Sequence, residues 1–420
     1  MRTRRALGRE FGWLWRAYAV SSFGTSLAFG AFPVIAILVL HAGPGEVSAL
    51  AAAGLAVGAA VAVPLGPWVE FRRKRSVMVA MDLARFAAML SIPAAFALGW
   101  LSFAQLLIVS VVSGAADITF KAASGACLKA LVPAEHLLVA NARMESTTWT
   151  STVLGPPLGG AAIGLFGPVT TVLADAASYL LSAAGIGAAG IRAIGGREPR
   201  PERAQAARIR GRDLLDGWRH ILTHPGLRRL FLNACLFNGL IMATEPLLAV
   251  LMLGRLGFAP WQYGLAFAVP CTGGLIGSRL SRRVVARFGS SLVMLAGGTL
   301  RACWVIWLGF MRPGLGGLLL VMAVEFGLIA CIGVSNPVIA TYRLEQTPSD
   351  LVTRTLSAWS VSTKASIAVL TGLWGVLASF TGPRAAITLA GMLLLTTPLL
   401  LPRRRVLKTD DQGVRPPVPV

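Results

Sequence analysis

Long apolar stretches recur along the whole of this sequence and constrain its fold more than any other feature. Taking Gly, Pro and clusters of charge as punctuation, we count twelve, at about residues 13–40, 46–69, 77–100, 102–130, 141–165, 168–191, 229–253, 260–286, 291–311, 315–341, 352–379 and 382–401. A helix that crosses a bilayer needs roughly 20 mostly apolar residues, because lipid offers no partners for backbone N–H and C=O groups. With 55% hydrophobic and 14% charged residues, the chain is predicted to be an all-α integral membrane protein with twelve transmembrane helices.

Positive charge is distributed unevenly between the two sets of loops. If the N-terminus is cytoplasmic, the cytoplasmic segments hold 28 Lys and Arg residues, and the opposite loops hold three, Arg255, Arg312 and Arg384. The positive-inside rule expects this asymmetry when both termini are cytoplasmic. The net charge of +21 therefore indicates membrane topology, and we expect the lipid bilayer rather than nucleic acid as the partner of the charged loops.

One long polar stretch divides the chain into two halves. We expect a six-helix bundle over residues 1–191, a cytoplasmic central loop over 192–228, a second six-helix bundle over 229–402 and a disordered cytoplasmic tail over 403–420. Residues 211–222 alternate apolar and charged residues at helical spacing, which predicts an amphipathic helix along the membrane surface. Gly66 and Arg85 have counterparts 211 and 216 residues later, at Gly277 and Arg301, which indicates that the halves are pseudo-symmetric repeats.

The basic loop after the second stretch resembles a family signature. Gly66 opens it, Glu70 follows after three residues, and Lys74 and Arg75 close it. This pattern is similar to the signature of the major facilitator superfamily, which runs Gly, three residues, Asp-Arg, one residue, Gly and two basic residues. Phe71 and Arg73 depart from it. The resemblance implies that this loop belongs to a latch between helices, formed with two residues of the third stretch: Gly66, Glu70, Arg73, Lys74, Arg75, Asp82 and Arg85.

The fifth stretch contains a second motif, "LGPPLGG" at residues 154–160. It looks like the Gly-Pro motif found in the fifth helix of exporters from the same superfamily, and the matching residues are Gly155, Pro156, Gly159 and Gly160. Within the superfamily the chain most resembles the bacterial drug, macrolide and siderophore exporters, although Thr25 stands where that group often has Asp. The resemblance implies a bend in this helix that serves transport, with plain helix packing as the alternative.

The resemblance implies the major facilitator fold and secondary active transport by alternating access. The expected activity is proton-coupled efflux of a small amphipathic molecule by a monomer in the cell membrane. The alternatives are an importer or uniporter of the same fold, or a transport-inactive membrane sensor or scaffold. No phosphate-binding loop for ATP is present in the sequence, and we expect neither an enzyme activity nor a cofactor.

Ionisable residues inside the apolar stretches are the candidates for coupling and substrate binding, because a charge in the bilayer requires a partner or a function. They are Asp117, Lys121, Glu245, Glu325 and Lys364. The superfamily resemblance implies that the first, fourth, seventh and tenth helices line a central cavity, which places the first four of these residues near a substrate path.

Each of these candidates also has a purely structural interpretation. Asp117 and Lys121 are four residues apart on one helix face and could form an ion pair. Glu245 has no basic residue within a helical turn, so it is the candidate for taking up and releasing a proton as the cavity opens and closes. Glu325 could pair with Lys364 or with Arg301 on another helix.

Metal binding is not expected from the sequence. The five cysteines lie in apolar stretches without paired or metal-ligand spacing. His220 and His224 have the spacing of a helical metal pair, but Pro225 follows at once and no third ligand is near.

Overall fold

The computed structural model describes residues 8–28, 30–54, 56–57, 73–133, 136–188, 211–348 and 351–402. These residues form helices joined by short turns, with no β-strand among them, which confirms the all-α prediction. Contacts divide the chain into two compact units, Met1–Gln205 with Met252–Ala268 and Ala206–Leu251 with Val269–Val420. Residues 192–210 and 403–420, predicted as loop and tail, lie outside the described residues.

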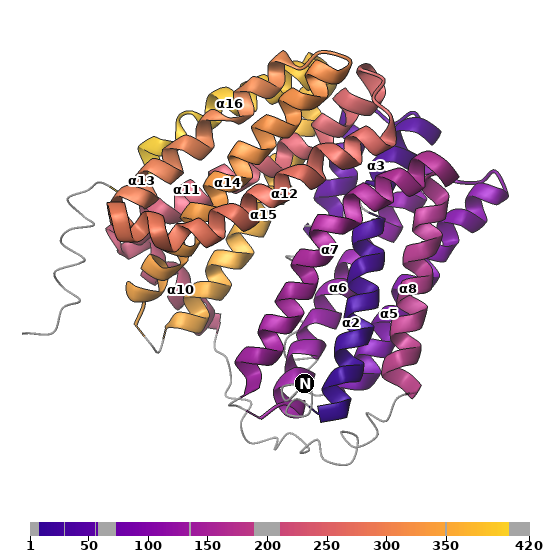
Figure 1. Cartoon of the computed structure of the whole chain (residues 1–420), viewed down its shortest axis with the longest axis horizontal. Helices are drawn as coiled ribbons and strands as arrows, with labels where there is room; N and C mark the ends of the chain where they lie inside the picture. Colours follow the sequence, from indigo (N-terminus) through magenta and orange to yellow (C-terminus); the bar gives the residue numbers. More distant parts are fainter. Residues whose placement is uncertain are drawn as a thin grey trace, which may run out of the picture. The chain divides into compact units, whose positions relative to one another are not determined.

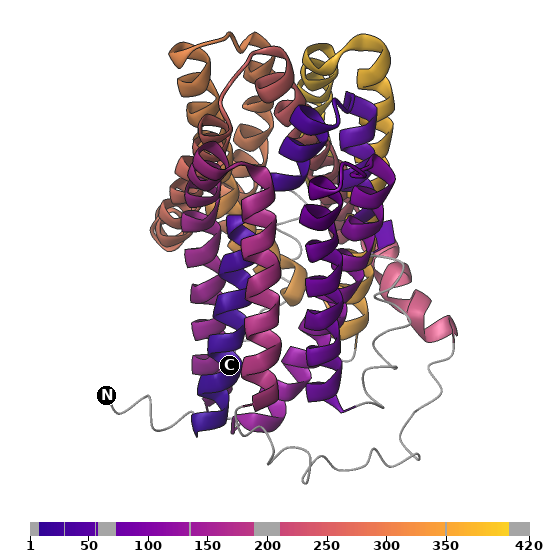
Figure 2. The ribbon, with the colours of Figure 1, turned by 90° about the vertical axis from the view of Figure 1, so that its right-hand side faces the viewer.

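The first unit is built from long helices packed along their lengths. Its elements are α2 (Gly8–Leu27), α3 (Ala31–Val34), the π-helix η1 (Ile35–Val39), α5 (Lys74–Ala97), α6 (Phe103–Leu131), α7 (Leu137–Phe166) and α8 (Pro168–Ala188). Helical residues 44–54 lie between η1 and α5. Helix α8 packs against α2 and α5, while α2 also packs against α7 and α5 against α6. Figure 1 and Figure 2 show α2 and α8 side by side in this bundle.

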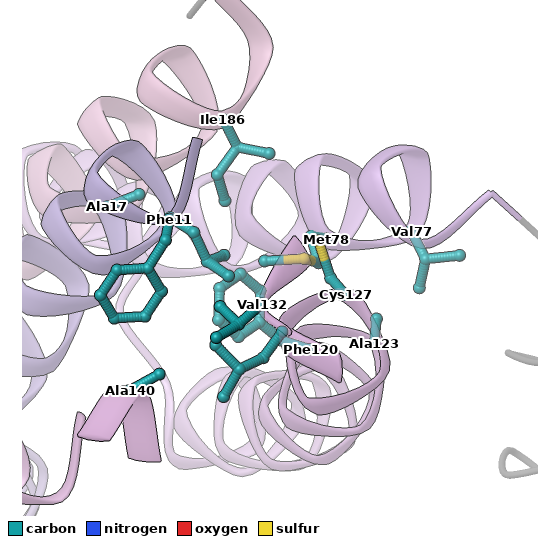
Figure 3. Close-up of a cluster of buried hydrophobic side chains, with 12 residues drawn as sticks. Phe11, Ala17, Val77, Met78, Phe120, Ala123, Cys127, Val132, Ala140 and Ile186 are labelled. Atoms are coloured by element: carbon teal, nitrogen blue, oxygen red, sulfur yellow. The ribbon is translucent and has the colours of Figure 1, made fainter. Parts of the chain in front are cut away.

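Apolar side chains close one end of the first unit. Figure 3 shows this cluster, which includes Phe11 of α2, Met78 of α5, Phe120 of α6 and Ile186 of α8. At the same end, Arg75 at the start of α5 donates hydrogen bonds to the carbonyl oxygens of Ile186 and Gly187. The starts of α2 and α5 are thereby joined to the end of α8.

The second unit is also built from helices. Its elements are α10 (Gly211–Thr223), α11 (Pro225–Ala249), most of α12 (Pro260–Phe288), α13 (Ser290–Leu300), the 3₁₀-helices η5 (Arg301–Cys303) and η6 (Val305–Phe310), α14 (Leu315–Glu345), α15 (Val352–Thr381), α16 (Pro383–Leu394) and η7 (Thr397–Leu400). The π-helix η4 (Val250–Arg255) follows α11. Helix α11 packs against α15 and α16, and α13 packs against α14.

Both halves of the chain contain a π-helix. In the first half η1 (Ile35–Val39) follows the short helix α3, and in the second half η4 (Val250–Arg255) continues directly from α11. A π turn widens the helix by one residue and is rare. Its occurrence at equivalent places in both halves, 215 residues apart, supports the internal repeat seen in the sequence.

Helix α10 occupies the predicted amphipathic segment, and it packs on α15. A Cβ atom on Gly217 would lie 2.4 Å from the carbonyl oxygen of Arg354, so only glycine allows this approach. The Trp218 indole Nε1 donates to Ser362 Oγ at 2.8 Å, and Ile221 is fully buried. One face of α10 is therefore part of the core of the second unit, while Leu215 and Leu222 remain exposed.

Nine helical segments among the described residues are long and apolar enough to cross a membrane: Gly8–Val39, Lys74–Ala97, Phe103–Gly125, Pro168–Gly187, Pro225–Arg255, Ser290–Phe310, Leu315–Glu345, Arg354–Thr381 and Pro383–Leu400. Helices α7 and α12, with 30 and 29 residues, are long enough as well, but Gly, Pro, Ser and Thr dilute their apolar residues. The remaining predicted stretch, residues 46–69, is described only in part. The described helices are consistent with the predicted count of twelve.

Two glycines of the "LGPPLGG" motif bring α7 against α2. A Cβ atom on Gly155 would lie 2.3 Å from the Cβ of Ser26, and one on Gly159 would lie 1.9 Å from the carbonyl oxygen of Leu27. Gly160 faces α12 instead, where a Cβ atom would lie 3.2 Å from the Cα of Gly264. Small residues at such crossings let helix backbones approach closely in membranes. The bend proposed for this helix stays a prediction.

Replacing Gly159 by Ala should destabilise the first unit. The added methyl group meets backbone rather than a movable side chain, so we expect a loss of at least about 1–3 kcal/mol in the free energy of unfolding. Thermal unfolding of the purified protein in detergent measures this. Gly12→Ala is the control, because nothing lies within 4 Å of its Cβ position. Equal midpoints for the two variants would contradict the packing role of Gly159.

Candidate functional site

A buried arginine lies at the centre of a polar network in the first unit. Arg85 of α5 is 2% exposed, and its Nη2 forms an ion pair with Asp82 one helical turn earlier. Its Nη1 lies 3.5 Å from Asp117 Oδ1 of α6. The guanidinium also packs against the rings of Phe120 and Tyr179, with 4.8 and 4.3 Å to the ring centroids. Arg85 therefore joins α5, α6 and α8.

Asp117 and Asp82 have further partners in this network. Lys121 Nζ lies 2.7 Å from Asp117 Oδ2, so the pair expected from the four-residue spacing is formed. Asp117 is shared between Lys121 and Arg85, which the sequence did not predict. Ser182 Oγ of α8 donates to Asp82 Oδ2 at 2.6 Å.

A third carboxylate, Asp175 of α8, lies within electrostatic range of Arg85. It is 1% exposed, and its Oδ1 accepts hydrogen bonds from Thr25 Oγ1 at 3.3 Å and Ser178 Oγ at 3.4 Å. Its Oδ2 has no hydrogen-bond partner among the described residues. Asp175 is not among the site residues predicted from the sequence. Thr25 was the sequence feature that could have indicated it, because the similar exporters often have Asp at that position. Here Asp175 of α8 supplies a carboxylate beside Thr25 from another helix.

The predicted latch is described only in part. Gly66 and Glu70 lie outside the described residues, and Arg73 is exposed just before α5. Asp82 and Arg85, assigned to the latch, pair with each other and with Asp117. The structure thus brings Asp82 and Arg85, which were expected in the cytoplasmic latch, together with Asp117, which was expected at the central cavity.

The second unit holds the carboxylates of Glu245 on α11 and Glu325 on α14. Both are partly buried, and they are close enough for their charges to interact. Among the described residues neither carboxylate has a hydrogen bond or an ion pair. Glu325 therefore has Glu245 and the Cys271 thiol as electrostatic neighbours, and neither acid has an ion pair with a described cation.

Neither cation suggested as a partner of Glu325 forms an ion pair with it or with any other described residue. Arg301 Nη2 donates to Asn233 Oδ1 at 2.6 Å, and its guanidinium packs 3.8 Å from the ring centroid of Phe237. Lys364 on α15 is partly buried and forms no ion pair with any described residue. The pairing alternative for Glu325 is therefore wrong in this structure, because Arg301 points to an amide and an aromatic ring.

The histidines of α10 and its neighbour have structural partners. His224 Nδ1 accepts a hydrogen bond from the backbone N–H of Leu227 at 3.3 Å and caps α11. His220 Nε2 lies 3.2 Å from the carbonyl oxygen of Gln346. In the described part of the chain no group of three or more His, Cys, Asp or Glu residues could hold a metal ion.

Comparison with known proteins relates this arrangement to a family. The family model described as Major Facilitator Superfamily matches residues 14–330. Similar solved structures include the nucleoside transporter NupG, with a TM-score of 0.71 and 8% identity over 93% of this chain and 98% of that chain. A POT family transporter in complex with 5-aminolevulinic acid has a TM-score of 0.67 and 11% identity, over 97% of both chains.

A third similar structure is a bacterial homologue of the iron transporter ferroportin in the inward-facing state. Its TM-score is 0.71, with 17% identity over 93% of this chain and 98% of that chain. No curated protein matches the sequence. At these identities the solved structures share the fold with this chain.

Proposed function

This chain belongs to the Major Facilitator Superfamily, and we propose that it is a proton-coupled exporter of a small amphipathic molecule that works by alternating access. The similar structures include transporters named for nucleosides and for iron, so the fold does not select the substrate. The proposal rests on the side chains. We place the protein in the cell membrane with both termini in the cytoplasm, as the charge asymmetry indicates.

The pair formed by Glu245 and Glu325 is the observation that supports proton coupling. An ionised carboxylate away from water is costly without a cation, and neither acid has an ion pair among the described residues. A proton bound to the pair removes this cost. Water that enters when the cavity opens can then accept the proton. In the first unit, Asp82, Asp117 and Asp175 surround two bases, Arg85 and Lys121. This group has one more acid than base, so it can also take part in proton transfer.

Outward transport of an amphipathic molecule is supported by two features of the first unit. The "LGPPLGG" residues resemble the exporter motif. An open pocket of about 780 Å³ lies among α2, α7 and α8 and is lined by apolar side chains such as Phe23 and Leu181, together with Thr147 and Arg143. Cavities of about 300–1,000 Å³ suit drug-sized molecules.

Sensitivity of a strain that lacks the protein, screened against antibiotics and metal chelators, would identify a transported compound. Its movement is then followed in inverted membrane vesicles with an imposed pH gradient. We expect uptake into these vesicles that stops when an ionophore collapses the gradient. Uptake that persists after collapse would exclude proton antiport and favour a uniporter. Binding of the compound without flux would favour the transport-inactive sensor.

Asp175→Asn should slow proton-driven transport by roughly tenfold or more if the carboxylate relays protons. The amide is nearly isosteric and can still accept a hydrogen bond from Thr25, so the fold is retained. The measurement is the initial transport rate as a function of pH, which should become flatter in the variant. Asp216→Asn removes an exposed acid that pairs with Arg354 and serves as the control. An unchanged pH profile for Asp175→Asn would assign the residue a structural role.

A further inference from the structure

Two arginines line one pocket inside the second unit. The pocket has a volume of about 240 Å³, and its polar lining consists of Asn233, Asn238, Arg301, Asn336, Arg343 and Trp359. Among the described residues that line it there is no Asp or Glu. The pocket therefore combines two positive charges with three amides and no resident carboxylate.

Arg301 is buried without a counter-ion among the described residues. Its side chain is 4% exposed, and one of its N–H groups is used by Asn233 Oδ1 at 2.6 Å. The amide nitrogen of Asn233 donates in turn to the carbonyl oxygen of Thr397 at 2.7 Å. This partner is neutral, and the Nε of Arg301 has no hydrogen-bond partner within the described part of the chain. Both the charge and a buried donor of Arg301 are left uncompensated.

Arg343 of α14 is partly buried and also forms no ion pair with a described residue. Its guanidinium packs 4.9 Å from the ring centroid of Trp359, and its Nε is likewise buried with no partner among described residues. An aromatic face stabilises a cation only in part. Two like charges beside one pocket also repel each other, so an anion between them would stabilise both.

In the first unit, the charge of the equivalent buried arginine is compensated by carboxylates of the protein itself. Arg85, which corresponds to Arg301 in the internal repeat, is neutralised by Asp82 three residues earlier and by Asp117. The position three residues before Arg301 is Gly298, which has no side chain to offer a charge. The repeat thus keeps the buried arginine in both halves, but among the described residues only Arg85 is paired with a protein carboxylate.

We propose that this pocket binds a small oxyanion of the phosphate or carboxylate type between Arg301 and Arg343. A guanidinium presents N–H groups in a fork that matches the oxygens of such anions, and the asparagine side chains add neutral donors. The volume is several times the roughly 30 Å³ share of a water molecule, so it accommodates a phosphate with water. This inference does not depend on the direction or the coupling of transport.

Calorimetric titration of the purified full-length protein in detergent with inorganic phosphate, at constant ionic strength, tests the site. We expect saturable binding to the wild type. Arg343→Gln should weaken it by roughly tenfold or more, the effect of losing a charge-assisted hydrogen bond. Arg287→Gln is the matched control, because Arg287 also packs on an aromatic ring, Phe288, but is exposed and outside the pocket.

Asn336→Asp provides an independent variant that keeps both arginines. It places a carboxylate in the pocket at an exposed position, so phosphate binding should be lost while the protein remains folded. Acetate in the same titration shows whether a planar anion also binds, and binding of either anion supports the site. The proposal is wrong if neither anion binds the wild type, or if Arg343→Gln and Arg287→Gln reduce binding equally.

Discussion

Replacing Glu245 by Gln is expected to abolish proton-coupled efflux while the protein still inserts and folds. The amide is nearly isosteric but cannot ionise, so it cannot release a proton when the cavity opens. It also removes the negative charge that Glu245 places near Glu325. Because the carboxylate has no ion pair among the described residues, its replacement leaves no buried cation without a partner.

Initial rates in inverted vesicles, with and without a pH gradient, measure this effect. The driven rate should fall to the undriven one in Glu245→Gln, and purified yield and thermal midpoint should match the wild type. Glu345→Gln removes an exposed acid at the end of α14 and should behave as the wild type. Wild-type efflux by Glu245→Gln would show that a different carboxylate couples transport, and the same assay on Glu325→Gln would then identify it or exclude the pair.

The fold could be predicted because hydropathy and charge are properties of segments. A helix in lipid needs an apolar run of a certain length wherever it lies in the chain, so the long helices could be located from residue type alone. The equivalence of Arg85 and Arg301 was visible as a spacing, and in the structure each guanidinium packs on an aromatic ring of its own unit. Helix α10 was predicted, but its approach to α15 through Gly217 was not.

Pairing across helices was the part that sequence could not provide. The contact of Arg85 with Asp117, and of Asp175 with Thr25, depends on how each helix is rotated about its axis. Spacing along one helix correctly indicated Asp117 with Lys121, because both lie on the same rigid element. Between helices, the pairing of Glu325 with Arg301 was suggested only because the two residues have opposite charges. In the structure Arg301 contacts the amide of Asn233 and the ring of Phe237.

Of the variants expected to be less stable, Arg85→Gln should show the largest loss in the free energy of unfolding. Arg85→Gln leaves Asp82, which is 0% exposed, without its cation, and breaking a buried ion pair in this way costs about 3–5 kcal/mol in the free energy of unfolding. Asp82→Asn should cost less, since Arg85 keeps Asp117 within 3.5 Å. The double variant should recover part of the loss, with a coupling energy of roughly 0.5–3 kcal/mol.

Unfolding of the purified protein in mixed micelles, monitored by circular dichroism, measures all three variants. The matched cycle is Asp216→Asn with Arg354→Gln, since that Asp–Arg ion pair is 3.0 Å long and both of its side chains are over 40% exposed, at 41% and 45%. Exposed pairs are worth about 0–1 kcal/mol, so the second cycle should show little coupling. Strong coupling at Asp216 and Arg354, with none at Asp82 and Arg85, would mean that the rings of Phe120 and Tyr179 hold Arg85 in place. In that case the three-helix junction would depend on aromatic packing, and the charge of Asp82 would be free to serve transport.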